Sequence, residues 1–172
     1  MKLLMVSDVH GDFKSLEKVL KNENFDRLII LGDLFSYGKI ILDLNNNEII
    51  KLLKKYKDKL ILIRGNCDYF IDYEKIGLYA NDIITIRANN HDITLTHGNR
   101  YYRGFMPDFH GDIFASGHTH IPSIIKERDM IYINPGSIGL PRSGSQKSYL
   151  VFDDNYIEIK TIDGALEKRM NI

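Results

Sequence analysis

Short apolar runs alternate with segments of helical periodicity over the first 65 residues. Continuous apolar runs occupy residues 2–7, 27–32 and 59–65, a pattern typical of strands buried on both faces. Between them, residues 12–22 and 47–57 place their leucine, isoleucine and valine side chains on one helical face. Asp12 stands where it can cap the first of these helices. Strands that alternate with helices predict parallel, right-handed βαβ units.

The second half of the chain has a different pattern, in which pairs of β-rich runs flank short polar turns. The pairs are residues 82–88 with 91–97, 123–127 with 130–134, and 148–152 with 156–160. Each pair predicts a β-hairpin. We therefore expect one α/β domain over residues 1–172. It should begin parallel, continue antiparallel, and form two packed sheets with helices on the outer face of at least one.

Side chains that can bind metals recur just past the apolar runs, each with a glycine beside it or nearby. Ligands of open α/β sheets bind beyond the carboxyl ends of the strands, so loops at that edge can surround one centre. Glycine permits the close backbone approach that a crowded site requires. The residues at these positions are Asp8, His10, Asp33, Asn66, His97, His118 and His120.

The spacing of these residues also fits metal binding. In an extended chain, residues i and i+2 point to the same side, so Asp8 and His10 can reach one ion, as can His118 and His120. The carboxylate of Asp33 can bridge two ions. Imidazole, carboxylate and amide donors suit manganese, iron, zinc, cobalt or nickel. A structural zinc site is not expected, because the chain has no thiolate cluster.

Each residue has a simpler interpretation when it is taken alone. Asp33 and Asn66 could be ordinary cap or turn residues, and His97 could be a buried core histidine. His91 and His110 lack the glycine and strand-end context, and we place them on the surface. The ordered arrangement of the whole set favours a metal centre.

Composition limits the partners of the protein. Lys and Arg balance Asp and Glu at 23 each, so there is no global basic field for a nucleic-acid polymer. The single cysteine, Cys67, excludes an internal disulfide. Ser7 and Asp8 interrupt the apolar start before it reaches the roughly 7 to 15 residues of a secretory signal, and no run approaches the ~18 to 20 residues of a membrane helix. We expect a cytoplasmic protein with no membrane partner.

The order Asp-x-His, Gly-Asp, Gly-Asn, His-Gly and Gly-His-x-His resembles the calcineurin-like metallophosphoesterase superfamily, from "SDVHG" to "NPGSIGLPR" (134–142). The size is similar to that of its small phosphodiesterase subfamily. The resemblance implies a four-layer α/β fold, in which a two-sheet β-sandwich is flanked by helices. It also implies self-association into a homo-oligomer, for which the sequence shows no signature of its own.

The resemblance further implies a dinuclear centre that hydrolyses a small phosphate diester through an activated hydroxide. Manganese is the expected metal, with nickel, iron, cobalt or zinc as alternatives. The ligands of one ion would be Asp8, His10 and His120, those of the other Asn66, His97 and His118, and Asp33 would bridge them.

The sequence offers three candidate catalytic residues beside this centre, namely Cys67, Asp68 and Arg142. Many relatives have histidine where this chain has Cys67, and often a second histidine at Asn99, so an obvious general acid is missing. We therefore expect slow turnover of esters with poor leaving groups and faster turnover of aryl esters. Arg142 and Arg100 are candidates for phosphate contact, although surface solvation explains Arg100 equally well. Asp68 could orient a metal ligand.

Alternative functions remain open at this point. The same centre could serve a phosphomonoesterase or a dinucleotide pyrophosphatase. The retromer small subunit, which has this fold, works mainly as an interaction scaffold and has lost ligand residues, whereas this chain retains every ligand position. Specificity is expected from the loops at residues 35–39 and 101–109.

Overall fold

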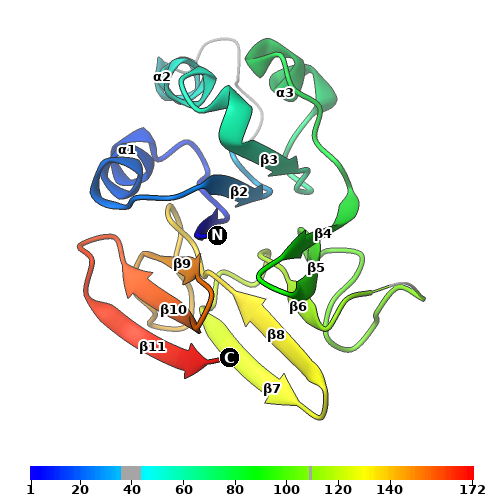
Figure 1. The fold of residues 1–172 in the computed structure, drawn as a ribbon. Coiled ribbons are helices and arrows are strands. Elements are labelled where there is room, and N and C mark those ends of the chain that lie inside the picture. The colour runs from blue at the N-terminus through cyan, green and yellow to red at the C-terminus, as the bar shows by residue number, and fades with distance from the viewer. Residues whose placement is uncertain (36–43, 109) are drawn as a thin grey trace.

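Two β-sheets pack face to face in the computed structural model, which describes residues 1–35, 44–108 and 110–172 (Figure 1). The first sheet has the strand order β11-β10-β9-β1-β2-β3. Neighbouring strands among β1, β2 and β3 are parallel, and the β1–β9, β9–β10 and β10–β11 pairs are antiparallel. The strands are β1 (Leu3–Val6), β2 (Arg27–Leu31), β3 (Leu60–Ile63), β9 (Ser148–Phe152), β10 (Tyr156–Thr161) and β11 (Leu166–Asn171).

The second sheet has the strand order β4-β5-β6-β8-β7. Its strands are β4 (Ile83–Ala88), β5 (His91–Thr96), β6 (Ile113–Ala115), β7 (Ser123–Glu127) and β8 (Met130–Asn134). The three predicted hairpins are confirmed as β4–β5, β7–β8 and β9–β10. A purely antiparallel second half is wrong, because β6 lies parallel to both β5 and β8. The long connection after β5 provides the crossover that a parallel pair requires.

Alternating side chains of β1 reach two different cores. Leu4 and Val6 pack towards the helices, and Leu3 and Met5 pack towards the second sheet. All four are at most 1% exposed, which explains why the run reads as continuously apolar rather than alternating. The first sheet is therefore the central layer of the molecule.

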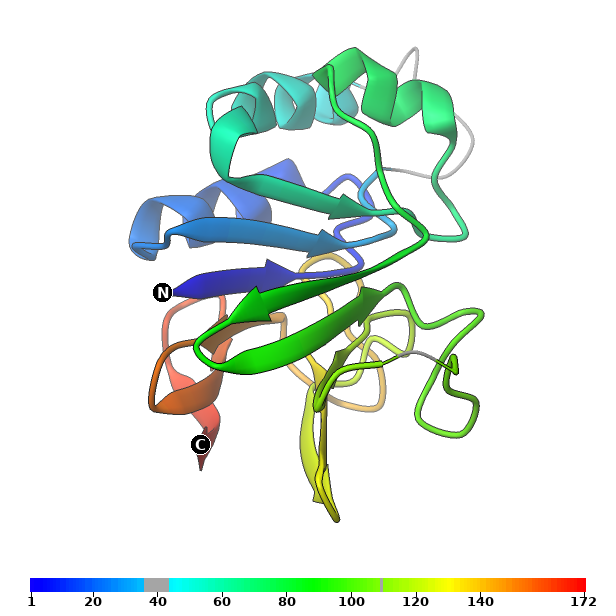
Figure 2. The same cartoon turned by 45° about the vertical axis from the view of Figure 1, so that its right-hand side comes forward.

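Three α-helices cover the outer face of this first sheet in the described part of the chain (Figure 2). They are α1 (Phe13–Asn22), α2 (Leu44–Lys54) and α3 (Phe70–Ile76), and the 3-10 helix η1 (Lys57–Lys59) precedes β3. Asp12 caps α1 as predicted, accepting a hydrogen bond from the Ser15 amide at 3.1 Å. Tyr56 lies beyond the end of α2, but its ring still packs on Phe25, with centroids 5.6 Å apart.

The outer face of the second sheet carries the chain between β5 and β6. The amide of Gly111 donates to Thr94 Oγ1 of β5 at 2.9 Å, on the face opposite the inter-sheet core. The two-sheet α/β sandwich is confirmed. Within the described residues its second outer layer is this irregular segment instead of a helix. None of the helices in the described ranges is long and apolar enough to cross a membrane.

Glu23, at the carboxyl end of α1, connects the helical layer to the antiparallel part of the first sheet. Its carboxylate accepts hydrogen bonds from Lys2 (3.1 Å), Tyr149 (2.8 Å) and Lys160 (2.9 Å). Burial raises the pKa of Glu23, but these donors outweigh burial and hold the pKa below its usual value. The ionised form therefore stabilises the fold above the unfolded-state pKa of glutamate, and this stability is lost as the pH falls through the lower folded pKa.

We expect Glu23→Gln to lower the free energy of unfolding at pH 7 by about 1–3 kcal/mol, because charge-assisted hydrogen bonds are lost. Urea denaturation between pH 7 and about pH 3 should show the difference from wild type shrinking as Glu23 becomes protonated. Glu17→Gln is the control on the same helix. Glu17 forms a surface pair with Lys21, so this substitution should change stability by less than about 0.5 kcal/mol. A Glu23→Gln deficit that stays constant across this pH range would contradict the assignment.

Candidate metal centre

The loops that follow five strands meet at one edge of the molecule. Two of the candidate ligands follow β1, one each follows β2, β3 and β5, and two follow β6. The structure brings all seven predicted side chains together here, whereas His91 pairs with Asp112 elsewhere and His110 is exposed. The gathered residues are Asp8, His10, Asp33, Asn66, His97, His118 and His120.

One group of donors centres on Asp8. Its Oδ1 lies 3.2 Å from Nε2 of His120 and 3.9 Å from Nε2 of His10. The two imidazole rings stack with centroids 5.1 Å apart. The other carboxylate oxygen, Oδ2, is held by the Ser7 hydroxyl at 2.6 Å and the His118 amide at 2.9 Å. Asp8 is thus oriented so that one oxygen faces two imidazole nitrogens.

A second group centres on His97. Its Nε2 lies 3.1 Å from Oδ1 of Asn66 and 3.5 Å from Oδ2 of Asp33. The His118 ring meets the His97 ring edge-on at a centroid distance of 5.1 Å. Asp33 Oδ2 also lies 3.7 Å from Nε2 of His10. Asp33 therefore stands between the two groups, where a bridging carboxylate would be required.

Backbone carbonyl groups decide which nitrogen of two imidazoles faces the centre. Nδ1 of His97 donates to Leu31 O at 2.7 Å, and Nδ1 of His120 donates to Leu140 O at 2.5 Å. A carbonyl oxygen only accepts, so Nδ1 carries the proton in both rings. In the neutral rings, Nε2 then directs a lone pair at a carboxylate oxygen. Such a contact requires a proton or a cation between the two atoms, and the donor set fits a divalent metal ion.

Burial and neighbouring charges together shift the pKa values of the candidate ligands. Burial lowers the pKa of His97, but Asp33 and Asp8 outweigh burial and the net pKa is raised. Burial raises the pKa of Asp33, and the neighbouring His97 more than reverses this. Burial lowers the pKa of His10 and His118. Metals bind neutral imidazoles and ionised carboxylates, so a metal ion here would replace the proton that the raised pKa of His97 favours.

The backbone reaches this arrangement through an uncommon conformation. Among the described residues, nine non-glycine positions have positive φ, and five are candidate ligands with φ between 46° and 64°. The extended geometry that we expected for the Asp-x-His and His-x-His pairs is therefore wrong, although both pairs do direct their side chains to the centre. Left-handed residues cost about 1–3 kcal/mol each and persist where surrounding contacts determine them. The five are Asp8, His10, Asp33, His118 and His120.

Two glycines allow the loops to approach each other closely. A Cβ atom on Gly65 would lie 2.1 Å from Asp33 Oδ1 and 2.2 Å from the Asp33 amide nitrogen. A Cβ atom on Gly117 would lie 1.8 Å from Ser7 Oγ. These distances are far below van der Waals contact, so a side chain at either position would displace a candidate ligand or its partner.

The three candidate catalytic residues have different positions. Cys67 lies at the centre, and its amide donates to Asp33 Oδ1 at 2.8 Å. Burial, followed by the charge of Asp33, raises the pKa of the Cys67 thiol to about 12. Arg142 donates its backbone amide to His120 O at 3.4 Å. A hydrogen bond with Asp8 raises the pKa of His120, and the nearby Arg142 charge opposes this.

Asp68 lies behind the centre and is only 5% exposed. It accepts hydrogen bonds from the Leu34 and Gly65 amides, both at 2.9 Å, and from the Tyr73 hydroxyl. Asp68 thus ties the loop after β2 to the loop after β3. This is a positioning role, because the side chain faces backbone donors.

The last residue of β8 and the segment after it support the centre in ways that the sequence did not reveal. The Ser137 hydroxyl donates to Asp8 O at 2.7 Å, and Leu140 O accepts the proton of His120 described above. Asn134 Nδ2 donates to Gly117 O at 2.8 Å, and Asn134 Oδ1 accepts from the Gly136 amide at 2.8 Å. These contacts join segments that lie far apart in the sequence, so they have no local sequence signal.

Comparison with known proteins agrees with this geometry. Residues 1–155 match the model of the calcineurin-like phosphoesterase superfamily domain. Phosphodiesterase YfcE of Escherichia coli (strain K12) is 28% identical over 167 residues, which cover 92% of this chain and 91% of that protein. The solved structure of E. coli YfcE, described as a phosphoesterase, superposes with a TM-score of 0.88 at 25% identity and covers 99% of this chain and 98% of that one.

A more distant solved structure shares the fold. Vps29 of Entamoeba histolytica in complex with Zn2+ has a TM-score of 0.67 at 19% identity, with 99% of both chains covered. The match over residues 1–155 shows that the chain belongs to the calcineurin-like phosphoesterase superfamily. Within it, the protein is of the small YfcE type. This membership supports a phosphoesterase function and implies divalent metal ions.

Gly65→Ala should lower the affinity for Mn2+ by about tenfold or more while the protein stays folded, because the new methyl group displaces Asp33. Isothermal titration calorimetry with Mn2+, together with circular dichroism, measures both properties. Gly104→Ala is the control, because its Cβ would meet only the movable ring of Tyr102, at 3.1 Å. Unchanged Mn2+ affinity in a folded Gly65→Ala protein would show that this close approach does not position the ligands.

Proposed function

We propose that the protein is a metal-dependent phosphodiesterase whose centre holds two divalent ions, with manganese as the expected metal. One observation carries this proposal. Nε2 atoms of imidazoles, fixed by backbone carbonyls in two of them, converge on two buried carboxylates. Asp8, His10 and His120 would hold one ion, Asn66, His97 and His118 would hold the other, and Asp33 would contribute to both.

The side chains of this centre would orient a phosphate ester for hydrolysis. Two bound divalent ions would lower the pKa of a shared water and offset negative charge on the phosphoryl group. Asp33, held by the Cys67 amide, fixes the separation of the two ligand groups. Arg142 lies next to His120, and its guanidinium can complement a phosphate oxygen. Asp68 keeps the loops after β2 and β3 together.

The leaving group would receive little proton assistance from this chain. Cys67 carries a thiol. A free thiol has a pKa of about 8.5 and is mostly protonated at neutral pH, and a thiol is a weak hydrogen-bond donor. General acid catalysis typically contributes 10²–10⁴-fold to a rate. We therefore expect the enzyme to favour esters whose leaving groups depart as stable anions, such as aryl oxides.

The preference for diesters rests on the relatives, since E. coli YfcE carries the name phosphodiesterase. A phosphomonoesterase or a dinucleotide pyrophosphatase would use the same centre. The complete set of seven side chains disfavours an interaction scaffold of the kind that the retromer small subunit represents. Substrate comparison separates these possibilities. Of the two loops expected to set specificity, residues 36–39 and 109 lie outside the described part of the chain.

The test compares bis(p-nitrophenyl) phosphate, p-nitrophenyl phosphate and dibutyl phosphate on the Mn2+-loaded protein. We expect the aryl diester to be hydrolysed with a higher kcat/KM than the aryl monoester. The dialkyl ester should react at least about 10²-fold more slowly than the aryl diester, because no strong acid assists its alcohol. Treatment with EDTA should abolish turnover, and Mn2+ should restore it.

Asp33→Asn is the matched loss-of-function variant, and it should remove metal-dependent turnover without unfolding the chain. Asp163→Asn is the control, because Asp163 is exposed and pairs with Lys18 instead of with a candidate metal ligand. Metal binding without turnover of any ester would favour a scaffold. Equal rates on the aryl and alkyl diesters would refute the leaving-group argument and leave the phosphodiesterase proposal standing.

A further inference from the structure

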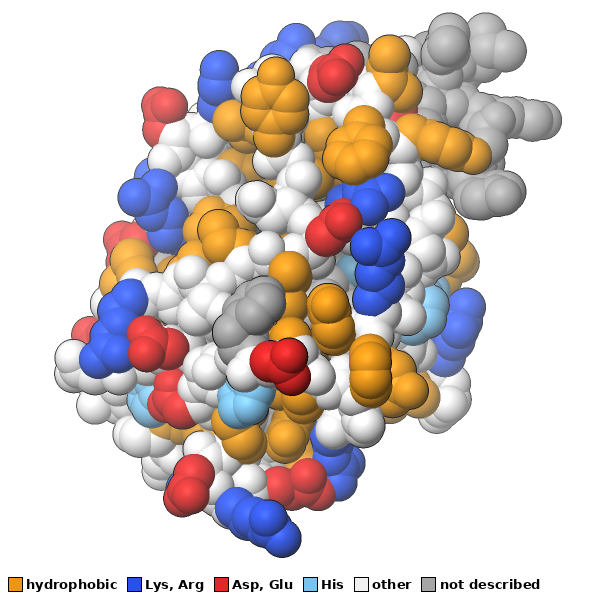
Figure 3. All heavy atoms as spheres, turned by 90° about the vertical axis from the view of Figure 1, so that its right-hand side faces the viewer, with side chains coloured by type: hydrophobic (Ala, Val, Ile, Leu, Met, Phe, Trp, Pro, Cys, Tyr) orange, Lys and Arg blue, Asp and Glu red, His pale blue; other side chains and the backbone are white. Residues whose placement is uncertain are grey.

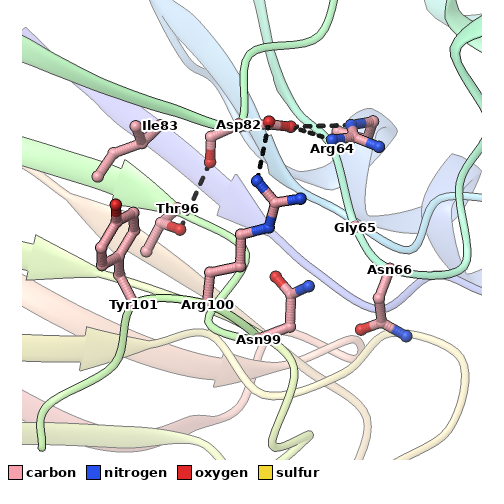
Figure 4. A pocket seen from close by; sticks show the side chains of 9 residues that line it. All are labelled: Arg64, Gly65, Asn66, Asp82, Ile83, Thr96, Asn99, Arg100 and Tyr101. Atoms are coloured by element: carbon pink, nitrogen blue, oxygen red, sulfur yellow. Dashed lines mark hydrogen bonds and ion pairs between the residues drawn. The ribbon is translucent and has the colours of Figure 1, made fainter. Parts of the chain in front are cut away.

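A cavity of about 420 Å3 adjoins the candidate metal centre. It lies where the end of β3, the start of β4 and the chain after β5 meet (Figure 4). Asn66 lines this cavity and also places its Oδ1 3.1 Å from Nε2 of His97. A phosphate ester at the metal centre would therefore have one substituent beside the cavity. The volume lies within the range of small-molecule sites.

One of the two arginines in the cavity wall is fully engaged. Arg64 donates from Nε (2.8 Å) and Nη2 (2.6 Å) to Oδ1 of Asp82. Its guanidinium also lies 4.3 Å from the centroid of the Phe70 ring. This pair joins the end of β3 to the start of β4. Arg64 is thus explained as a structural contact.

Among the described residues, the second arginine has no comparable partner. Arg100 reaches Asp82 only through Nη1 to Oδ2, at 3.5 Å, and its side chain is 68% exposed. Figure 4 shows its guanidinium group in the middle of the lining side chains, with Asp82 above it and Asn99 below it. Two guanidinium groups therefore share one carboxylate, which leaves one positive charge uncompensated among the lining residues. The cavity is suited to an anion.

The rest of the cavity wall can accommodate a polar organic group. Asn99 and Thr96 offer neutral hydrogen-bonding groups. Tyr101 offers an aromatic face and stacks on Phe105 at a centroid distance of 6.0 Å. The face that carries β4, β5 and the following loop shows basic side chains beside an acidic one, with hydrophobic side chains around them (Figure 3). A substituent with both a ring and a negative charge fits this surface.

We propose that this cavity binds a second phosphate, carried by one substituent of the diester, and that Arg100 contacts it. The guanidinium group matches phosphate geometry bidentately, and Arg100 gives up only one long ion pair to turn towards it. The inference rests on the proposed function, which places the reacting phosphate at the metal centre. It makes Arg100 a specificity-determining residue and names the substrate class as diesters with a further phosphate group.

A matched pair of chromogenic esters tests this inference on the Mn2+-loaded protein. One is thymidine 5′-(p-nitrophenyl phosphate), and the other is the same ester with an added 3′-phosphate. We expect kcat/KM to be about tenfold or more higher for the 3′-phosphorylated ester, mainly through a lower KM, because the extra phosphate adds a charge-assisted contact. Equal values for the two esters would overturn the inference while leaving the proposed function intact.

Arg100→Gln should reduce this preference to about onefold, because the neutral amide cannot form the ion pair. Arg103→Gln is the control, since Arg103 lies in the same loop but its guanidinium is held by Glu127. The control should keep the wild-type preference. A preference that survives Arg100→Gln would overturn the role of Arg100.

Binding measurements separate the inference from the proposed function. Isothermal titration calorimetry of thymidine 3′,5′-bisphosphate against thymidine 5′-monophosphate needs no turnover. Tighter binding of the bisphosphate, lost in Arg100→Gln, would support the cavity even if neither ester were hydrolysed, and the proposed function alone would then fail. Equal binding of the two nucleotides together with equal kinetics would refute the cavity as an anion site.

Discussion

The buried meeting of two carboxylates with several imidazoles is the constraint on which the rest of the structure depends. Asp8, Asp33, His97 and His120 have side chains that are at most 3% exposed. Carboxylates brought together away from water repel each other and lose hydration, so the arrangement requires positive charge among them. Protonated histidines or divalent cations can supply that charge, and the convergence of several imidazole nitrogens on the carboxylates fits divalent cations. The same positive charge, held at the edge where the strands end, would also offset the negative charge of a phosphate ester during hydrolysis.

The fold provides the rigidity that this constraint demands. The two apolar cores on either face of the first sheet fix the strand ends, and loops that leave those ends adopt left-handed conformations at five candidate ligands. The cost of these conformations is offset by backbone and side-chain contacts from remote segments, such as Ser137 to the carbonyl of Asp8 and Asn134 to that of Gly117. The residues that orient the ligands are therefore spread along the whole chain, and the last of them come from the segment after β8.

Much of this arrangement follows from local sequence pattern, and the remainder depends on tertiary contacts. Buried strands, three hairpins and the capped first helix were predictable because hydrophobic periodicity reports burial directly. The helix α3 was missed because seven residues are too few to establish a period, although Gly77 ends it with φ of 74°. Strand β11 was missed because five of its six residues are exposed, with no apolar face to detect. The left-handed ligands, the role of Asp68 and the charge balance of Arg64, Asp82 and Arg100 arise only when distant segments meet.

Anomalous diffraction from crystals of the Mn2+-saturated protein, recorded at the manganese absorption edge, tests the central claim most directly. Our account predicts two peaks per chain: one among Asp8, His10 and His120, the other among Asn66, His97 and His118, with Asp33 in contact with both. A single peak, or peaks away from these side chains in the correctly folded protein, would contradict it.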